Sequence, residues 1–174
     1  MTGLEIFLFG KLPTHGDFVS RGLSPSARDT WDAWCVATLV EGRERLKAAF
    51  DQSIVSTPPW CFLLPPTRPG ERWQAGCATP STDRTGRPFL FVLGVASDAA
   101  IGPDEGARIA AVMTRQIYQA FKEDLDLDIF VASTADALAA TGTAGTGGAA
   151  TGEAIAMTSW RTGWLAPGIV LEGI

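Results

Sequence analysis

The stretch Ala78–Ala96, read ATPSTDRTGRPFLFVLGVA, constrains the fold of this chain more than any other stretch. It contains an apolar run, Phe89–Val95, which is short and rich in Phe, Leu and Val, as is typical of a strand buried on both faces of a sheet. The polar loop before it, Thr79–Arg87, carries Ser81, Asp83, Arg84 and Arg87. Because a buried strand fixes the loop beside it, the sequence predicts a rigid cluster of polar groups at one end of a sheet. A charged turn that closes its own sheet is the simpler interpretation, and a functional loop is the alternative.

The length and the charge of the chain restrict its class. Its 174 residues fit a single domain, 1–174. A chain of this size buries roughly 70% of its unfolded surface, which is enough for a core without metal or disulfide support. With 14 basic and 19 acidic residues, the net charge of −5 gives no support for binding to nucleic acid or to an anionic membrane surface.

The cysteines and the apolar stretches indicate a cytoplasmic protein. The three cysteines are widely spaced and form no CxxC pair, which favours reduced thiols in the core. The N-terminal run Leu4–Phe9 is too short for a signal sequence. No stretch approaches the roughly 20 apolar residues that span a bilayer, so no membrane insertion is expected.

Hydrophobic periodicity predicts two long helices. The first begins at Ser24, with serine as the N-cap and Pro25 in the first helical position, and its apolar residues recur at helical spacing as far as Phe50. The second opens at Ile101–Glu105, with acidic residues in its first turn, and continues through Phe121.

Short apolar runs bounded by breakers predict the strands, which are Ile6–Phe9, Trp60–Leu64, Trp73–Thr79 and Phe89–Val95. The segment Gly10–Leu23 is interrupted by Gly and Pro and is expected to be a loop. Alternating Leu and Asp over Leu125–Ile129 predicts a half-exposed strand. The sequence Ser133–Asp136 resembles a capping box that would start a short helix through Ala140.

The C-terminal part contains a low-complexity stretch. Residues 141–152 are only Thr, Gly and Ala, which predicts a flexible insertion. Beyond it, Ala154–Trp160 and Ile169–Leu171 are expected to be strands that return to the core. Strands and helices do not alternate regularly, and this pattern favours an α+β fold over a parallel α/β fold.

The sequence contains no recognisable metal or cofactor motif. A single His and three scattered Cys provide no ligand set at zinc spacing. The run Asp124-x-Asp126-x-Asp128 resembles the start of an EF-hand, but its sixth position is Ile129 rather than Gly and its twelfth is Ala135 rather than Glu. Neither a phosphate-binding loop nor a dinucleotide fingerprint is present. No metal and no cofactor are therefore expected.

One catalytic arrangement remains conceivable. His15, the sole histidine, lies two residues from Asp17, and Ser81 and Asp83 lie in the other polar loop. If the two loops met, these four residues could form a small hydrolase or phosphoesterase site. However, no serine lies in a GxSxG elbow.

Four segments, taken in order, resemble the TagF family of type VI secretion accessory proteins. They are FGKLPTHGDFVSRGL, the WDAW of the first helix, PPWCFLLPP and PSTDRTGRPFLF. The family pattern is G-K-L-P-x-x-G-D-F-V-x-R, a W-D-x-W helix, a P-x-W-x-F strand and P-S-x-D-x-x-G-R before an aromatic-rich strand. The matches extend from Gly10 to Leu93, about half of the chain. Cys61 stands where the family commonly has a basic residue, and residues 141–152 look like an insertion private to this chain.

The resemblance implies both a fold and a function. It implies an α+β domain in which long helices pack on an antiparallel or mixed sheet. It also implies a non-enzymatic, cytosolic, post-translational repressor of type VI secretion, which binds the forkhead-associated (FHA) protein of the system alongside a threonine kinase–phosphatase pathway. The oligomeric state and the binding face are left open.

The motif positions that carry over from the family are Lys11, Asp17, Arg21, Ser81, Asp83, Gly86 and Arg87, with His15 and Arg84 as neighbours. In one hypothesis, the two polar loops converge in a structural lock, with Asp17 and Asp83 paired to Arg21, Arg84 or Arg87. In the other, this cluster or a Trp-bearing surface near it binds the FHA protein. Asp17 or Asp83 would then mimic phosphothreonine, because FHA domains bind anions through Arg.

Overall fold

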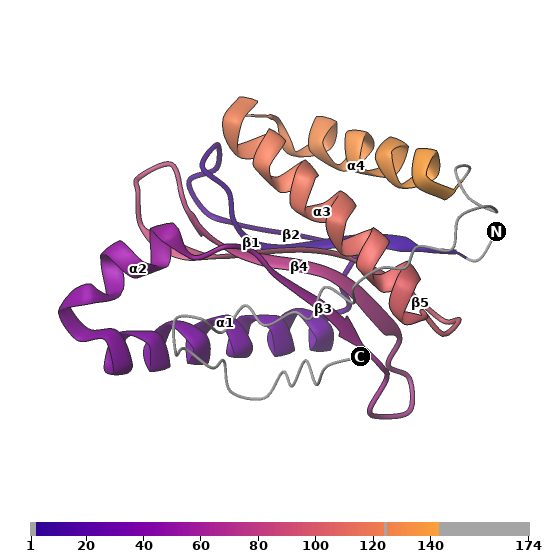
Figure 1. Cartoon of the computed structure of the whole chain (residues 1–174), viewed down its shortest axis with the longest axis horizontal. Helices are drawn as coiled ribbons and strands as arrows, with labels where there is room; N and C mark the ends of the chain where they lie inside the picture. The colour runs from indigo at the N-terminus through magenta and orange to yellow at the C-terminus, as the bar shows by residue number, and fades with distance from the viewer. Residues whose placement is uncertain (1–2, 124, 143–174) are drawn as a thin grey trace.

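The apolar run that dominates the sequence forms the central strand of a five-stranded antiparallel sheet (Figure 1). The computed structural model describes residues 3–123 and 125–142. Its strands are β1 (Glu5–Lys11), β2 (Phe18–Arg21), β3 (Trp60–Leu64), β4 (Trp73–Thr82) and β5 (Pro88–Ser97). Their order is β2-β1-β5-β4-β3, and each neighbouring pair is antiparallel. The expected α+β fold with an antiparallel sheet is therefore confirmed.

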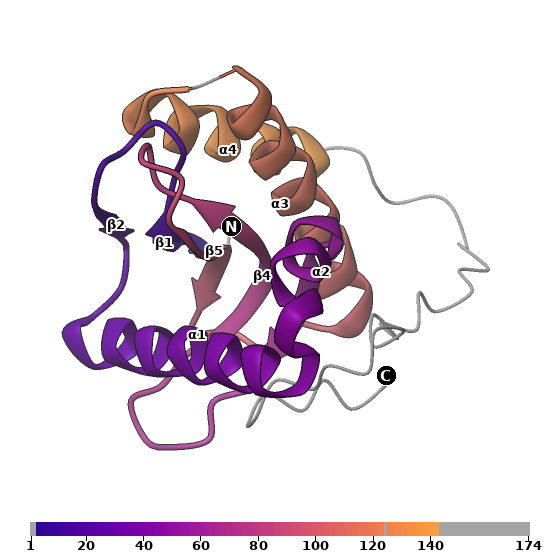
Figure 2. The same cartoon turned by 90° about the vertical axis from the view of Figure 1, so that its left-hand side faces the viewer.

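Helices cover both faces of this sheet (Figures 1 and 2). On one face pack α1 (Pro25–Leu46), the short 3-10 helix η1 (Lys47–Ala49) and α2 (Phe50–Ser56). On the other face pack α3 (Pro103–Glu123) and α4 (Leu127–Gly142). The two long helices that the sequence predicts, α1 and α3, thus lie on opposite sides of the sheet.

Strand β5 is buried along almost its whole length because both faces of the sheet are covered. Its side chains alternate between the two faces, as the pleat of a strand requires. Leu93 packs with Met113 and Ile117 of α3. Val92 belongs to the opposite core, which contains Trp31 of α1. A strand with two buried faces explains the apolar run in the sequence.

A pair of glycines makes room for the aromatic core under α1. Gly76 of β4 and Gly94 of β5 lie directly opposite each other. A Cβ atom on Gly94 would lie 2.8 Å from the ring of Phe7. That ring in turn packs against Trp31, with 6.0 Å between ring centroids, and against Phe62, at 6.4 Å. Position 94 therefore needs glycine because the ring of Phe7 occupies the space of a side chain, whereas a Cβ atom on Gly76 would meet the backbone of the neighbouring strand at Leu93.

Helix α1 starts as the sequence predicts. The hydroxyl of Ser24 accepts a hydrogen bond from the backbone N–H of Ala27 at 3.2 Å, and Pro25 is the first helical residue. The predicted helix is interrupted, however, before it reaches Phe50. Lys47 has a positive φ of 47°, which ends the α-helix and leads into η1 and α2.

Two expectations about strands near the polar loops are corrected by the structure. The segment Phe18–Arg21, expected to be loop, is the edge strand β2, because it pairs with residues 8–11 of β1. Strand β4 continues through Thr82, three residues beyond its predicted end. The polar loop is therefore shortened to residues 83–87.

The segment Leu125–Ile129 is not a strand. Helix α4 begins at Leu127, and the Asp126 carboxylate accepts a hydrogen bond from the backbone N–H of Asp128 at 2.9 Å. Phe130 is fully buried and packs on Phe91 of the sheet. The helical conformation is favoured over a strand because it places Phe130 in the core. Ser133 accordingly lies inside the helix, not at its start.

The remaining expectations concern the C-terminal part of the chain, from residue 141 onward. The residues at 141–142 end α4 instead of opening a flexible insertion. The rest of that insertion and the expected strands Ala154–Trp160 and Ile169–Leu171 lie outside the described residues. Within the described part of the chain, none of the helices has the length and apolar character needed to cross a membrane.

Candidate functional site

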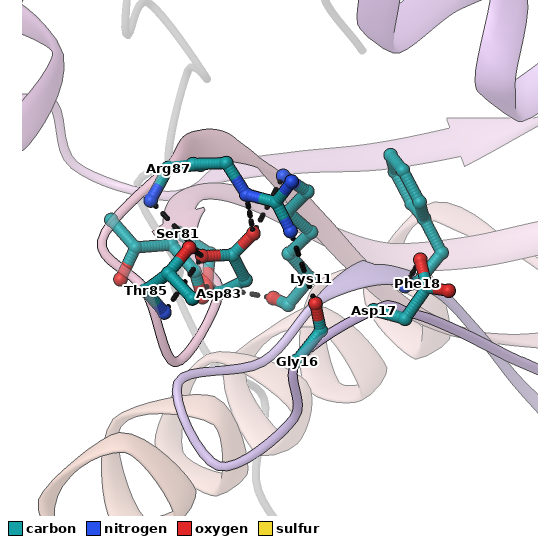
Figure 3. Close-up of polar contacts among 9 residues, drawn as sticks. Lys11, Gly16, Asp17, Phe18, Ser81, Asp83, Thr85 and Arg87 are labelled. Atoms are coloured by element: carbon teal, nitrogen blue, oxygen red, sulfur yellow. Dashed lines mark hydrogen bonds and ion pairs between the residues drawn. The ribbon is translucent and has the colours of Figure 1, made fainter.

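Two polar loops meet at one end of the sheet. The first loop, residues 12–17, follows β1, and the second loop, residues 83–87, joins β4 to β5. Since β1 and β4 both run antiparallel to β5 on either side of it, their last residues lie at the same end of the sheet. The loops are then joined directly. Nη2 of Arg87 donates to the carbonyl of Gly16 at 3.1 Å (Figure 3), and the backbone N–H of Arg84 donates to the carbonyl of His15 at 2.9 Å.

The carboxylate of Asp83 lies at the centre of this junction and is only 2% exposed. Its Oδ2 accepts hydrogen bonds from Nζ of Lys11 at 2.9 Å and from Nε of Arg87 at 2.6 Å. Its Oδ1 accepts from the backbone N–H of Thr85 at 2.9 Å, from the Thr85 hydroxyl at 2.6 Å and from the backbone N–H of Arg87 at 3.0 Å (Figure 3). We call Lys11, Asp83, Thr85 and Arg87 the Asp83 lock.

These contacts keep Asp83 ionised. The hydrogen bond from the Thr85 side chain, followed by those from Lys11 and Arg87, holds the pKa of Asp83 well below its usual range. Burial acts in the opposite direction but does not outweigh them. The carboxylate is therefore negatively charged at any physiological pH and has little tendency to take up a proton.

Lys11 is held at both of its ends. Its carbonyl accepts a hydrogen bond from the hydroxyl of Ser81 at 2.7 Å, which ties β1 to β4. Its ammonium group lies 5.3 Å from the ring centroid of Phe18 and 6.0 Å from that of Phe89, in addition to its ion pair with Asp83. A buried cation needs such compensation, because an unpaired charge in the interior is strongly destabilising.

Three charged candidate residues lie outside the lock. Asp17 is exposed, and its Oδ1 accepts from the backbone N–H of Phe18 at 2.8 Å. Arg21, also exposed, pairs with Asp128 of α4 at 2.6 Å. Arg84 is exposed, and its side chain forms no ion pair with any of the described residues. The pairing of Asp17 with an arginine is thus not present, whereas Asp83 pairs with both Arg87 and Lys11.

Among the described residues, no side-chain hydrogen bond joins His15 to Asp17, Ser81 or Asp83, as a hydrolase site would require. Nδ1 of His15 lies 2.9 Å from the hydroxyl of its neighbour Thr14. The hydroxyl of Ser81 donates to a backbone carbonyl rather than to a base. Among the residues that the structure describes, no three His, Cys, Asp or Glu side chains gather in a way that could hold a metal ion.

The cysteines are unsuited to nucleophilic chemistry. Burial raises the pKa of Cys77 to about 12. Burial also raises the pKa of Cys35 and that of Cys61. The thiolate is the reactive form of cysteine, so all three side chains are inert thiols at neutral pH.

Sequence reasoning missed two residues of the site, Phe18 and Thr85. Thr85 supplies two of the hydrogen bonds to Asp83, and the spacing Asp-x-Thr-Gly in a turn is the signal that could have identified it. Phe18 lies on β2 with 46% of its surface exposed, beside the lock. It belongs to the G-D-F-V segment at the start of the chain, but its exposure depends on an edge strand that was not predicted.

Comparison with known proteins places this geometry in a family. The family described as TagF N-terminal domain, type VI secretion system-associated, matches residues 8–141, from β1 to the end of α4. The structure is also similar to the crystal structure of PA0076 from Pseudomonas aeruginosa PAO1, with a TM-score of 0.66 and 25% sequence identity. That alignment covers 75% of this chain and 61% of PA0076. A search of curated proteins found no match. The chain therefore belongs to the TagF N-terminal domain family of type VI secretion system-associated proteins.

Proposed function

We propose that this chain is a non-enzymatic, post-translational repressor of type VI secretion, which acts in the cytoplasm by binding the FHA-domain protein of the system. Its family membership supports a role in this system. The observation that carries the proposal is the Asp83 lock, which joins two loops into one rigid end of the sheet while Asp17, Phe18 and Arg84 stay exposed. A rigid, exposed surface is what a binding module needs.

The same contacts argue against the alternative, a hydrolase that uses His15, Asp17, Ser81 and Asp83. A general base must reach the proton that it removes and must have a pKa near the working pH. The hydroxyl of Ser81 is bonded to the carbonyl of Lys11, and the pKa of Asp83 is held far below neutrality. A carboxylate so strongly stabilised is a poor base.

The exposed carboxylate of Asp17 is the group that we expect the FHA domain to bind. Asp83 is unsuited to this role because it is buried and both of its oxygens accept hydrogen bonds inside the lock. Asp17 uses Oδ1 to accept from Phe18, and Oδ2 accepts no hydrogen bond from the residues that the structure describes. FHA domains bind anionic groups through Arg, so Oδ2 is free to meet such a side chain.

Isothermal titration calorimetry of this chain against its cognate, unphosphorylated FHA-domain protein at moderate salt tests the proposal. Saturable binding with one-to-one stoichiometry is the expected result, and Asp17→Asn weakens it. Asp136→Asn, which changes an exposed carboxylate on α4, serves as the matched control and leaves the affinity unchanged. Absence of binding while both proteins are folded overturns direct recognition of the unmodified partner.

A further inference from the structure

We infer that Phe18 and Arg84 together form the hot spot through which the FHA-domain protein binds. This inference rests on the proposed function and adds the residues that supply most of the affinity. Two side chains beside the Asp83 lock, Phe18 and Arg84, are exposed to solvent.

Phe18 is an exposed aromatic ring with a fixed position. Its ring packs edge-to-face on Phe89, with 4.7 Å between centroids, and stacks on Phe9 at 6.1 Å. Nζ of Lys11 lies 5.3 Å from the same ring. Nevertheless, 46% of the residue is open to solvent. An aromatic side chain that is already immobilised loses little conformational entropy when a partner covers it, so its burial contributes efficiently to affinity.

The backbone of Arg84 is held by hydrogen bonds, and its guanidinium group forms no ion pair with residues 3–123 and 125–142. Its N–H donates to the carbonyl of His15 at 2.9 Å, and the turn is closed by a bond from the N–H of Gly86 to the carbonyl of Asp83 at 2.9 Å. Gly86 has a φ of 81°, which glycine tolerates well. The other two arginines among the candidate residues behave differently: Arg87 bonds to Asp83, and Arg21 bonds to Asp128.

The guanidinium group of Arg84 lies over the first loop, which leads directly to Phe18. A Cβ atom added to Gly16 would lie 3.4 Å from Nη2 of Arg84. Gly16 is two residues before Phe18 and adjacent to Asp17. The guanidinium group of Arg84 therefore lies beside the loop segment that carries the exposed residues Asp17 and Phe18. Aromatic residues and arginine are enriched at protein interfaces, and a few such anchors commonly supply most of the binding energy.

The chemistry of this surface defines the complementary face of the partner. Phe18 requires an apolar pocket, Arg84 requires a carboxylate or phosphate, and Asp17 requires a basic group such as the anion-binding arginine of an FHA domain. The chain as a whole carries a net charge of −5, so an unpaired arginine here is a local exception that selects an anionic group on the partner. The FHA-domain protein, which binds anionic groups through Arg, is the partner that fits these requirements.

The test is calorimetry of the intact chain against the cognate FHA-domain protein, with Phe18→Ala and Arg84→Glu compared with wild type. Each variant is expected to raise Kd by at least about 30-fold, the effect of a hot-spot residue. Tyr118→Ala and Arg108→Glu, exposed residues on α3, are the matched controls and leave Kd unchanged. Near-ultraviolet circular dichroism shows whether Phe18→Ala keeps the aromatic packing of wild type. If that packing is lost, the result for Arg84→Glu decides, because this variant removes no packed side chain.

The calorimetry separates a failure of the hot spot from a failure of the proposed function. Wild-type binding that neither variant weakens overturns the hot spot and leaves the proposed function intact. No wild-type binding overturns both. Sedimentation that shows a dimer of this chain, lost in Phe18→Ala, would identify the surface as a contact between two copies and would also overturn the assignment to the FHA-domain protein.

Discussion

Nζ of Lys11 lies 2.9 Å from Oδ2 of Asp83, and both side chains are almost completely buried. This ion pair joins the end of β1 to the turn between β4 and β5, residues that are 72 positions apart in the chain. It explains why a loop with several charged groups can follow a strand that belongs to the core. The charge of Asp83 is compensated inside the protein by Lys11 and Arg87, which ties the turn to the end of β1.

Removing the charge at the centre of the lock lowers stability. In Asp83→Asn, the ammonium group of Lys11 remains buried without its anion, and the hydrogen bonds from Thr85 and Arg87 lose their ionic acceptor. We expect a clear decrease in the midpoint of thermal unfolding. Asp17→Asn, which changes an exposed carboxylate, shifts the free energy of unfolding by no more than about 0.5 kcal/mol. Equal midpoints for Asp83→Asn and wild type would contradict the structural role of the lock.

The lock also makes stability depend on pH in a defined direction. The pKa of Asp83 is lower in the folded than in the unfolded chain, where an Asp has a pKa of about 3.9. Below that value the unfolded chain binds the proton more readily, so stability rises with pH there. The contribution of Asp83 is complete above about pH 5 and decreases as the pH falls through about 4. Urea unfolding between pH 3 and 7 should show a steeper loss of stability at acidic pH for wild type than for Asp83→Asn. Parallel profiles would show that this carboxylate is not stabilised in the folded state.

The glycine pair in the sheet predicts a packing defect. In Gly94→Ala, the new Cβ would lie 2.7 Å from the carbonyl oxygen of Ala75 and 2.8 Å from the ring of Phe7. Overpacking of this kind destabilises a core by about 1–3 kcal/mol. Gly102→Ala is the control, because its Cβ would meet no atom within 4 Å. Denaturant unfolding measures both variants, and an unchanged Gly94→Ala would mean that the ring of Phe7 is not where the structure places it.

Adjacent residues in α4 should respond in opposite ways to truncation. Phe130 is fully buried against Phe91, whereas Ile129 is 58% exposed. Phe130→Ala is expected to lower the free energy of unfolding by about 3–5 kcal/mol. Ile129→Ala lies on the surface and changes it by no more than about 0.5 kcal/mol. Similar losses in the two variants would argue that this helix is oriented differently.

The features that the sequence predicted well are local. Ser24 and Pro25 start a helix through contacts within one turn, and β5 is recognisable because both of its faces are apolar. The short strand β2 was not predictable in this way. Only Val19 of its four residues is buried, so the segment has no recognisable strand pattern of its own. It forms a strand because it pairs with β1.

The first turn of α4 shows how tertiary contacts decide an ambiguous pattern. The alternation of Leu and Asp over Leu125–Ile129 fits a strand, but five residues are too few to exclude a helix. The docking of Phe130 on Phe91 selects the helix.

The site was predicted only in part. The sequence suggests that the two polar loops converge, and the structure does bring Lys11, Ser81, Asp83 and Arg87 together. The sequence could not assign different roles to Asp17 and Asp83, because the roles depend on which of the two carboxylates is buried. Asp83 turns inward at the end of β4, whereas Asp17 precedes an edge strand and stays in solvent.

Type VI secretion in living cells tests the central claim, which is repression through the surface formed by Asp17, Phe18 and Arg84. The amount of secreted type VI substrate is measured in the organism that encodes this chain, after deletion of its gene and after return of wild type, Arg84→Glu or Arg108→Glu at equal protein levels. If this surface mediates repression, wild type and Arg108→Glu restore repression, whereas Arg84→Glu leaves secretion high. Full repression by Arg84→Glu, or no effect of the deletion, would contradict it.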